Sequence, residues 1–330
     1  MSDFRFDAPA KQRVWDFNAE LFAGRRPASK ILAEHCSDSV EFNCNCPMDR
    51  LEGASAIAQG LFEPLRRALP DVSRRTLLFF GEGTGDSGWV TAAGNYAGKF
   101  QAPLFGIAPT GRPVFIRFGE FYRIESGRIA GCHLMLDLLD LMRQAGAFPL
   151  RPSLGEAIVV PGPATQDGIV CASMPPEEGR KSMKLVVDMI DGLMRYDPDT
   201  GDFGVMRHAD FWHPDFMWYG PAGIGTTRGI DGFIAGHQRP FLTAFPDRKG
   251  VGHEAELAEG NYTATFGWPS LGATHAGGGW LGLAPTHRKI TMRVMDWWRR
   301  DGELLAENWV LIDIPDLLRQ LGMDLFESEG

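Results

Sequence analysis

Several features are scarce in this chain of 330 residues, and each scarcity excludes a class of protein. Lys and Arg are outnumbered by Asp and Glu, which gives a formal charge of −9, and the arginines are scattered. Nucleic acids and anionic membranes require clustered cations, so we expect neither as a partner. No apolar stretch is long enough to span a bilayer, and the first residues lack the pattern of a signal peptide. We therefore expect a cytoplasmic protein.

Cysteine is also scarce, and its spacing excludes two kinds of site. The five cysteines form no paired framework, which is typical of free thiols in a reducing compartment. Three of them lie close to His35, at Cys36, Cys44 and Cys46. A structural zinc site needs a second Cys pair with matching spacing, which the sequence lacks. We expect no metal and no cofactor.

What the chain does contain is an internal repeat. Gly106 and Gly282 are 176 residues apart, within the matching segments 104–112 and 280–288. The same offset relates Asp137 to Asp313, and residues 141–146 to residues 317–322. Matches at one offset over about a hundred residues predict two copies of one domain. Between them lies a stretch rich in Pro and Gly, so we predict domains at 1–147 and 181–330 and a linker at 148–180.

Each copy reads as helices followed by strands. The first helix of each is marked by apolar residues at helical spacing, Val14, Phe17 and Leu21 in one copy and Leu185, Met189 and Leu193 in the other. Strands then dominate, which indicates an α+β fold rather than alternating β and α elements. We expect a curved antiparallel sheet wrapped around the N-terminal helices, with a cavity at its mouth.

The clearest strand pair is a hairpin over residues 290–313 that turns at Asp301-Gly302. If these two are the turn residues, Arg300 opposes Glu303. One face then carries the opposed pairs Ile290 with Asp313, Met292 with Leu311, Val294 with Trp309 and Asp296 with Glu307. We predict that this face lines the cavity.

Four segments of the second copy resemble the SnoaL-like polyketide cyclase family, within the nuclear-transport-factor-2-like superfamily. They are residues 213–218, 229–233, 273–286 and 309–322. The first of these segments begins with His213-Pro214-Asp215, and the last ends in Leu321-Gly322. The first copy is more divergent. It has Gly98-Lys99 in place of Thr274-His275, and His133 in place of Trp309.

The resemblance implies two tandem cone-shaped α+β barrels whose sheets pack as a pseudo-dimer, with further homo-oligomers possible. It also implies a cofactor-independent enzyme in which an aspartate on the last strand is the general base, here Asp313 and Asp137. The base would remove an acidic C–H flanked by carbonyls, and the enolate would close an intramolecular aldol. The wider superfamily includes isomerases, hydrolases, dehydratases and non-catalytic binding domains.

The sequence leaves two interpretations of the aspartates open. Asp137 and Asp313 each precede an apolar helical segment with a second carboxylate three residues on, which is also the pattern of a helix N-cap. We interpret His275 as a third catalytic candidate, against the alternative of a hydrogen-bonded structural histidine. The candidates for substrate contact are Trp309, Trp218, His213, His237, Asp296, Leu311, Met292 and His133.

These observations lead to two hypotheses of function. The first is an enzyme that uses an Asp base on a small, carbonyl-bearing apolar molecule, in polyketide cyclase-like aldol chemistry or a related isomerase, hydrolase or dehydratase reaction. The second is a non-catalytic small-molecule binding protein, in which the first half serves as a scaffold.

Overall fold

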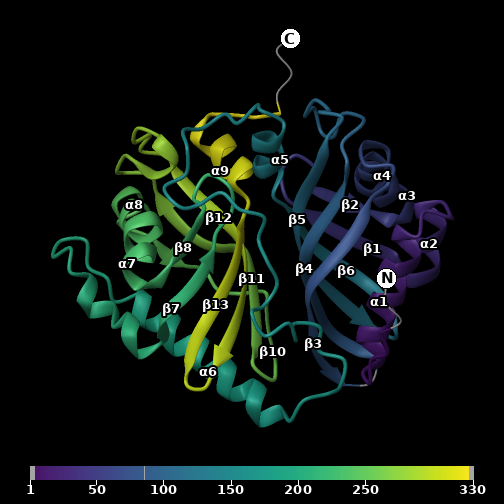
Figure 1. The fold of residues 1–330 in the computed structure, drawn as a ribbon, viewed down its shortest axis with the longest axis horizontal. Helices are drawn as coiled ribbons and strands as arrows, with labels where there is room; N and C mark the ends of the chain where they lie inside the picture. Colours follow the sequence, from purple (N-terminus) through teal and green to yellow (C-terminus); the bar gives the residue numbers. More distant parts are fainter. Residues whose placement is uncertain (1–3, 85, 327–330) are drawn as a thin grey trace. The chain divides into compact units, whose positions relative to one another are not determined.

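The chain forms two compact α+β units. The computed structural model describes residues 4–84 and 86–326, and Figure 1 shows its fold. The first unit comprises residues up to Phe148 together with Pro161–Ser173 and the residues from Asp324 onward, and the second comprises Pro149–Val160 together with Met174–Met323. Among the described residues, no helix has both the length and the apolarity needed to cross a bilayer. The expected α+β fold is confirmed in both halves.

The elements of the first unit run from helices into strands. The helices are α1 Pro9–Phe22, α2 Ala28–His35, α3 Gly53–Ile57, α4 Glu63–Ala68 and α5 Leu138–Gln144, with a π-helical turn at Ala58–Phe62. The strands are β1 Cys36–Cys44, β2 Arg50–Glu52, β3 Ser73–Thr84, β4 Ser87–Lys99, β5 Pro113–Glu125 and β6 Arg128–Leu136.

The second unit repeats this order. Its α-helices are α6 Pro176–Leu193, α7 Gly229–Phe233, α8 Arg239–Ala244 and α9 Ile314–Leu321. Its strands are β7 Trp212–Tyr219, β8 Thr226–Arg228, β9 Lys249–Gly250, β10 Ala255–Glu259, β11 Tyr262–Thr274, β12 Lys289–Asp301 and β13 Leu304–Ile312. A π-helical turn at Ile234–Gln238 again joins the two short helices, and 3₁₀ turns replace α2.

Each unit has one open, mixed sheet with helices along one face (Figure 1). The strand order is β2-β1-β6-β5-β4-β3 in the first unit and β10-β11-β12-β13-β7-β8 in the second, where β9 also pairs with β11. The expectation of an antiparallel sheet is corrected at one position, because β1 pairs with β6, and β7 with β13, in parallel. A crossover through the helices brings these first and last strands together in the same direction.

The first helix of each unit begins at a proline, whose missing N–H removes one of the donors that a helix start leaves unpaired. Val14, Phe17 and Leu21 are fully buried on α1, which packs on β3 and β4. In the second unit α6 buries Val186 and Met189 and packs on β10 and β11. The apolar face of the first helix, formed by residues at helical spacing, therefore packs against the sheet in both units.

Both aspartates of the repeat cap a helix. The backbone N–H of Asp140 donates to Asp137 Oδ1 at 3.0 Å, and that of Asp316 donates to Asp313 Oδ1 at 3.1 Å. The capping interpretation is confirmed for α5 and α9. Asp313 also accepts from Arg293 Nη1 at 3.2 Å, and its side chain is fully buried.

The hairpin forms over the expected residues, but the predicted register is wrong. Asp301 pairs with Leu304, so the turn residues are Gly302 and Glu303. A bulge at Ala306 adds a further shift, and beyond it Asp296 pairs with Val310 and Val294 with Ile312. Beyond the bulge, each β12 residue pairs with a β13 residue three positions later than predicted. Because three is odd, the side chains of β13 exchange faces relative to the prediction, whereas those of β12 keep the predicted faces. Trp309 and Leu311 therefore lie on the face opposite Met292 and Asp296.

The two repeats differ by an insertion in β11. Gly267 pairs with Val294 and Leu271 with Met292, so four residues of β11 span two of β12. Strand β4 has no such insertion where Gly94 pairs with Phe118 and Tyr96 with Ile116. The predicted match of Lys99 with His275 is therefore corrected by one residue. The N–H of His275 bonds to Arg288 O as that of Phe100 bonds to Arg112 O, so His275 corresponds to Phe100.

The stretch between the repeats is attached to both units in turn. The N–H of Glu156 and the carbonyl of Glu156 both bond with Thr226 in the second unit. Val170 donates to Phe79 O, and Phe79 donates to Gly168 O, in the first unit. Helix α6 begins at Pro176, within the stretch of Pro and Gly.

Candidate functional site

The second unit contains a cavity of about 330 Å³. It lies between helices α6, α7 and α8 and the face of the sheet that carries β11, β12 and β13. Its wall is largely apolar, and five aromatic residues contribute to it: Trp212, Trp218, Phe233, Phe241 and Trp298. A concave apolar site with a few polar groups is the usual form of a small-molecule site.

The aromatic residues of the wall contact one another. Trp212 stacks on Phe216 with ring centroids 4.3 Å apart, and Trp218 lies over the His237 ring at 4.2 Å. Phe233 contacts the rings of both tryptophans at tilted angles. These contacts hold flat aromatic surfaces in the cavity wall, on which a planar ligand can stack.

One carboxylate, that of Asp296, belongs to the cavity wall. Asn308 donates an amide N–H to Asp296 Oδ1 at 3.3 Å and its second N–H to the carbonyl of Trp297 at 3.0 Å. Both N–H groups of the Asn308 amide therefore bond to residues of β12. These two bonds fix the orientation of the amide toward the Asp296 carboxylate. Asp296 is half-buried and Asn308 is buried. The amide stabilises the ionised carboxylate in this largely apolar setting.

His237 is the second polar group of the wall. Burial lowers the pKa of His237 to about 3, so the ring is neutral at physiological pH. Its Nδ1 is buried and meets no hydrogen-bond partner in the described part of the chain. Nε2 is therefore the ring atom left to meet a bound molecule. A neutral imidazole can donate there to a carbonyl or an oxyanion.

The opening of the cavity lies along a broken edge strand. Residues 249–252 are exposed, and Gly250 and Gly252 line the cavity beside Ser270 and Leu271 of β11. Arg248 precedes this segment and also lines the cavity. One of its guanidinium N–H groups donates to the carbonyl of Leu193 at 2.8 Å.

The cavity brings together four of the residues predicted for substrate contact: Trp218, His237, Asp296 and Met292. Trp309 and Leu311 are buried on the opposite face of β13, where Trp309 stacks on Tyr219 at 5.4 Å. The prediction placed them beside Asp296 because it used the wrong register. Their places in the wall are taken by Asn308, Val310 and Ile312.

The remaining candidates of the second unit lie outside the cavity wall. Asp313 is engaged with the first turn of α9 and with Arg293. His275 is buried, its Nδ1 accepts from the N–H of Thr286 at 3.3 Å, and its ring lies near Phe245. His213 is exposed, and its Nδ1 accepts from the N–H of Asp215 at 3.2 Å.

In the first unit the position of Asp296 is held by Glu120. Glu120 pairs with Ala92 in β4 as Asp296 pairs with Thr265 in β11. The carboxylate of Glu120 is fully buried and accepts two N–H groups of Arg74, at 2.8 and 2.7 Å.

Two tyrosines complete this buried network. The hydroxyls of Tyr96 and Tyr122 each donate to Glu120 at 2.8 Å. Burial raises the pKa of Tyr96 and Tyr122 well above the usual value, so both remain donors. The Arg74 guanidinium also lies 4.0 Å from the Phe118 ring centroid, and Tyr96 stacks on Phe118 at 4.5 Å. Every oxygen of this carboxylate is therefore engaged by the protein itself.

The two candidates predicted in the first unit take no part in this network. Asp137 caps α5, and His133 lies half-buried on β6 opposite Phe121 of β5. The sequence analysis expected no zinc site at the cysteines, because a second Cys pair with matching spacing is lacking. Within residues 4–84 and 86–326, no group of three His, Cys, Asp or Glu side chains could hold a metal ion.

The reasoning from sequence missed Asn308 and Arg248. Asn308 lies on a strand that was read with its faces exchanged. Arg248 belongs to an irregular segment where strand periodicity gives no orientation. The repeat itself carried a signal, because Arg74 and Tyr96 of the first copy become Gly250 and Gly272 at the offset of 176, and such losses of volume mark a cavity. The strand pairing then matches Tyr96 with Leu271.

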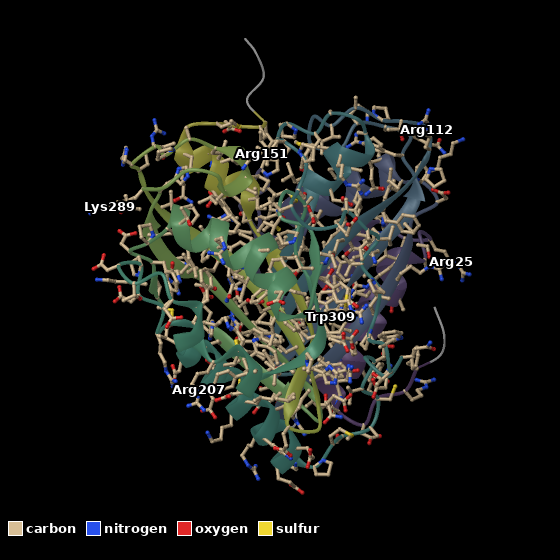
Figure 2. The ribbon with its side chains drawn as sticks, turned by 60° about the vertical axis from the view of Figure 1, so that its left-hand side comes forward. Arg25, Arg112, Arg151, Arg207, Lys289 and Trp309 are labelled. Carbon is tan, nitrogen blue, oxygen red and sulfur yellow. The ribbon has the colours of Figure 1, made fainter. Side chains whose placement is uncertain are left out.

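Cations elsewhere on the molecule are dispersed. Figure 2 shows Arg25, Arg112, Arg207 and Lys289 at its periphery, and all four are exposed.

Comparison with known proteins identifies one family in both halves. The sequence model of the SnoaL-like polyketide cyclases matches residues 12–145 and 193–321. No curated protein matches the chain.

Among solved structures, similar folds each correspond to one unit. A Jannaschia sp. CCS1 protein described as a SnoaL-like polyketide cyclase is 17% identical, with a TM-score of 0.37, over 43% of this chain and 93% of that one. AclR from Streptomyces galilaeus, described as a hydroxylase, is 22% identical, with a TM-score of 0.35, over 46% and 87%. TsrD from Streptomyces laurentii is 22% identical, with a TM-score of 0.36, over 42% and 96%.

Proposed function

Because the chain belongs to the SnoaL-like polyketide cyclase family in both of its halves, we propose that its second unit is a cofactor-independent enzyme with Asp296 as general base. Its substrate is a small, carbonyl-bearing and largely apolar molecule. The observation that carries this proposal is a single carboxylate, held by the Asn308 amide, in an aromatic cavity. A base in such a site meets a C–H acid with little competing water.

The proposed reaction is an intramolecular aldol closure or a related enolisation. Asp296 takes the proton from a carbon beside a carbonyl, and the electron pair of the C–H bond becomes an enolate. The enolate carbon forms a C–C bond with a second carbonyl, and the resulting alkoxide takes up the proton that Asp296 received, which regenerates the base. The product is an isomer of the substrate, so the reaction needs no oxidant or reductant. The Nε2 of neutral His237 donates to the enolate oxygen.

Asp296 replaces Asp313 as the proposed base for geometrical reasons. Asp313 is committed to the cap of α9 and to Arg293, and it lies outside the cavity wall. A base must come within hydrogen-bond reach of the proton that it removes. Asp313 could reach a molecule in this cavity only by giving up the cap.

The test uses 2-tetralone, a bicyclic ketone, because the exchange of its C–H protons in D₂O reports enolisation without requiring the natural electrophile. We expect the wild-type protein to accelerate this exchange, followed by NMR. Asp296→Asn should lower the catalysed rate about 10²–10⁴-fold, the usual contribution of a general base. Asp313→Asn is the matched control and should retain the rate per folded molecule.

Two outcomes would contradict the proposal. If Asp296→Asn kept the wild-type rate while Asp313→Asn lost it, the base would be Asp313. If 2-tetralone bound to the wild-type protein without any accelerated exchange, the non-catalytic binding function would be supported instead.

A further inference from the structure

We propose that the cavity of the second unit binds an organic anion, an aromatic or other apolar body with a carboxylate group, and that Arg248 holds the carboxylate. This inference rests on the proposed function only for the orientation of the ligand, with its C–H acid toward Asp296. The anion site itself rests on the surroundings of Arg248.

Arg248 is a half-buried cation of the cavity wall without an acidic partner. Its guanidinium donates to the carbonyl of Leu193, at the last residue of α6, and its guanidinium carbon lies 5.8 Å from the Tyr196 ring centroid. Among the described residues, no carboxylate forms an ion pair with it. Burial lowers the pKa of Arg248, and no protein carboxylate opposes this effect. A desolvated guanidinium of this kind is stabilised by an incoming anion.

The buried arginines show what Arg248 lacks, whereas the half-buried Arg66 of the first unit likewise donates to backbone carbonyls, those of Arg26 and Leu21. Arg74 is fully buried against Glu120, and Arg299 and Arg300 are buried with ion pairs to Glu307 and Glu178. In each of these the protein supplies the counter-charge. Arg248 lines the cavity, where a bound anion would take the place of such a protein carboxylate.

The fold does not require an arginine at this position. The N–H of Arg248 donates to Phe245 O, and in the first unit the N–H of Val72 donates to Leu69 O in the same turn. The equivalent residue of the closed unit is therefore an apolar Val72. At this position of the turn an arginine occurs only in the unit that has the cavity. In the first unit Arg66, from α4, donates to a carbonyl in the last turn of α1.

The distribution of the lining indicates the form of the ligand. The aromatic residues of the lining are buried, whereas Arg248 and Ser270 are half-buried and Gly250 is exposed. The cavity volume of about 330 Å³ lies at the lower end of the range of about 300–1,000 Å³ that is usual for small-molecule pockets. A bicyclic body with one carboxylate fits this space. The Ser270 hydroxyl provides a second donor to that carboxylate.

The experiment compares 2-naphthoate with the neutral 2-naphthamide, which has the same shape. Binding is measured at constant ionic strength by the quenching of tryptophan fluorescence, since three tryptophans line the cavity. We expect the wild-type protein to prefer 2-naphthoate about tenfold or more. Arg248→Gln keeps a donor for Leu193 O and should abolish this preference while leaving 2-naphthamide affinity unchanged. Arg248→Lys should restore part of it.

Lys249→Met is the matched control, because it removes the same charge from an exposed neighbour outside the cavity wall. It should retain the preference for 2-naphthoate. Equal binding of the two compounds by the wild-type protein, survival of the preference in Arg248→Gln, or binding of neither compound would overturn the proposal. Asp296→Asn separates this proposal from that of catalysis, because it should abolish 2-tetralone exchange and still bind 2-naphthoate.

Discussion

Each of the two units places a carboxylate at the equivalent point of its own sheet, and the two carboxylates have different surroundings. Glu120 is enclosed by Arg74, Tyr96 and Tyr122, which engage both of its oxygens. Asp296 has Asn308 as its neighbour and a cavity beside it. One backbone therefore supports either a buried polar network or a binding site.

Three replacements account for most of the difference. By the strand pairing, Arg74, Tyr96 and Phe118 of the first unit correspond to Gly250, Leu271 and Val294 of the second. The first three stack on one another, and the last three line the cavity. The volume of these side chains decides whether the interior is closed, so changing them should convert one interior toward the other.

The largest effect is expected from Glu120→Gln. This change removes the counter-charge of a buried Arg74, and breaking such a pair destabilises by about 3–5 kcal/mol. Urea denaturation followed by circular dichroism measures it. Asp296→Asn should change the free energy of unfolding by less than about 1 kcal/mol, since Asp296 is half-buried at a cavity. Equal losses in the two variants would remove the distinction between the units.

The next effect comes from filling the open interior. A side chain at Gly250 meets open space, so Gly250→Arg combined with Val294→Phe should fold and rebuild part of the closed network around Asp296. We expect the affinity for 2-naphthamide to fall tenfold or more, which is about 1.4 kcal/mol. Isothermal titration calorimetry measures the affinity. An unchanged affinity would show that these positions do not limit the cavity.

The pH dependence of stability should distinguish the second unit. Because the folded pKa of His237 is near 3 and the unfolded value is near 6.5, its contribution is complete above about pH 6.5 and is lost as the pH falls toward 3. The slope is at most about 1.4 kcal/mol per pH unit. His237→Phe keeps the stack with Trp218 and should reduce the slope between pH 6 and 4. Identical slopes would mean that His237 is already protonated in the folded protein.

The smallest effect is expected at the two caps. Asp137→Ala and Asp313→Ala should each lower the free energy of unfolding by about 1 kcal/mol, the usual value of an N-cap. Asp313→Ala also removes the partner of Arg293. Thermal unfolding of both variants measures the two losses. Unchanged stability in either variant would contradict the capping role of its aspartate.

The parts of the fold that follow from local pattern were predictable from the sequence. Apolar spacing marked α1 and α6, and the Asp residues marked the starts of α5 and α9. The repeat and the family resemblance predicted two α+β units. The parallel pairing of the first and last strands was not predictable from alternation, because a parallel strand alternates in the same way.

The site was predicted only in part. Alternation along β12 placed Met292 and Asp296 together on the cavity face, and the structure agrees. The partner strand was turned over because nothing in its composition marks the extra residue at Ala306. A single bulge therefore exchanged Trp309 and Leu311 for Asn308 and Val310 in the predicted wall.

The interruption between β9 and β10 has a consequence for how this site can change. In the first unit β3 runs unbroken from Ser73 to Thr84, whereas in the second the corresponding edge stops at Gly250 and resumes at Ala255 opposite the two-residue insertion of β11. Insertions or deletions in 251–254 would resize the entrance while leaving Asp296, His237 and Asn308 untouched. The range of molecules that the cavity admits can therefore diverge by loop length, independently of these three side chains.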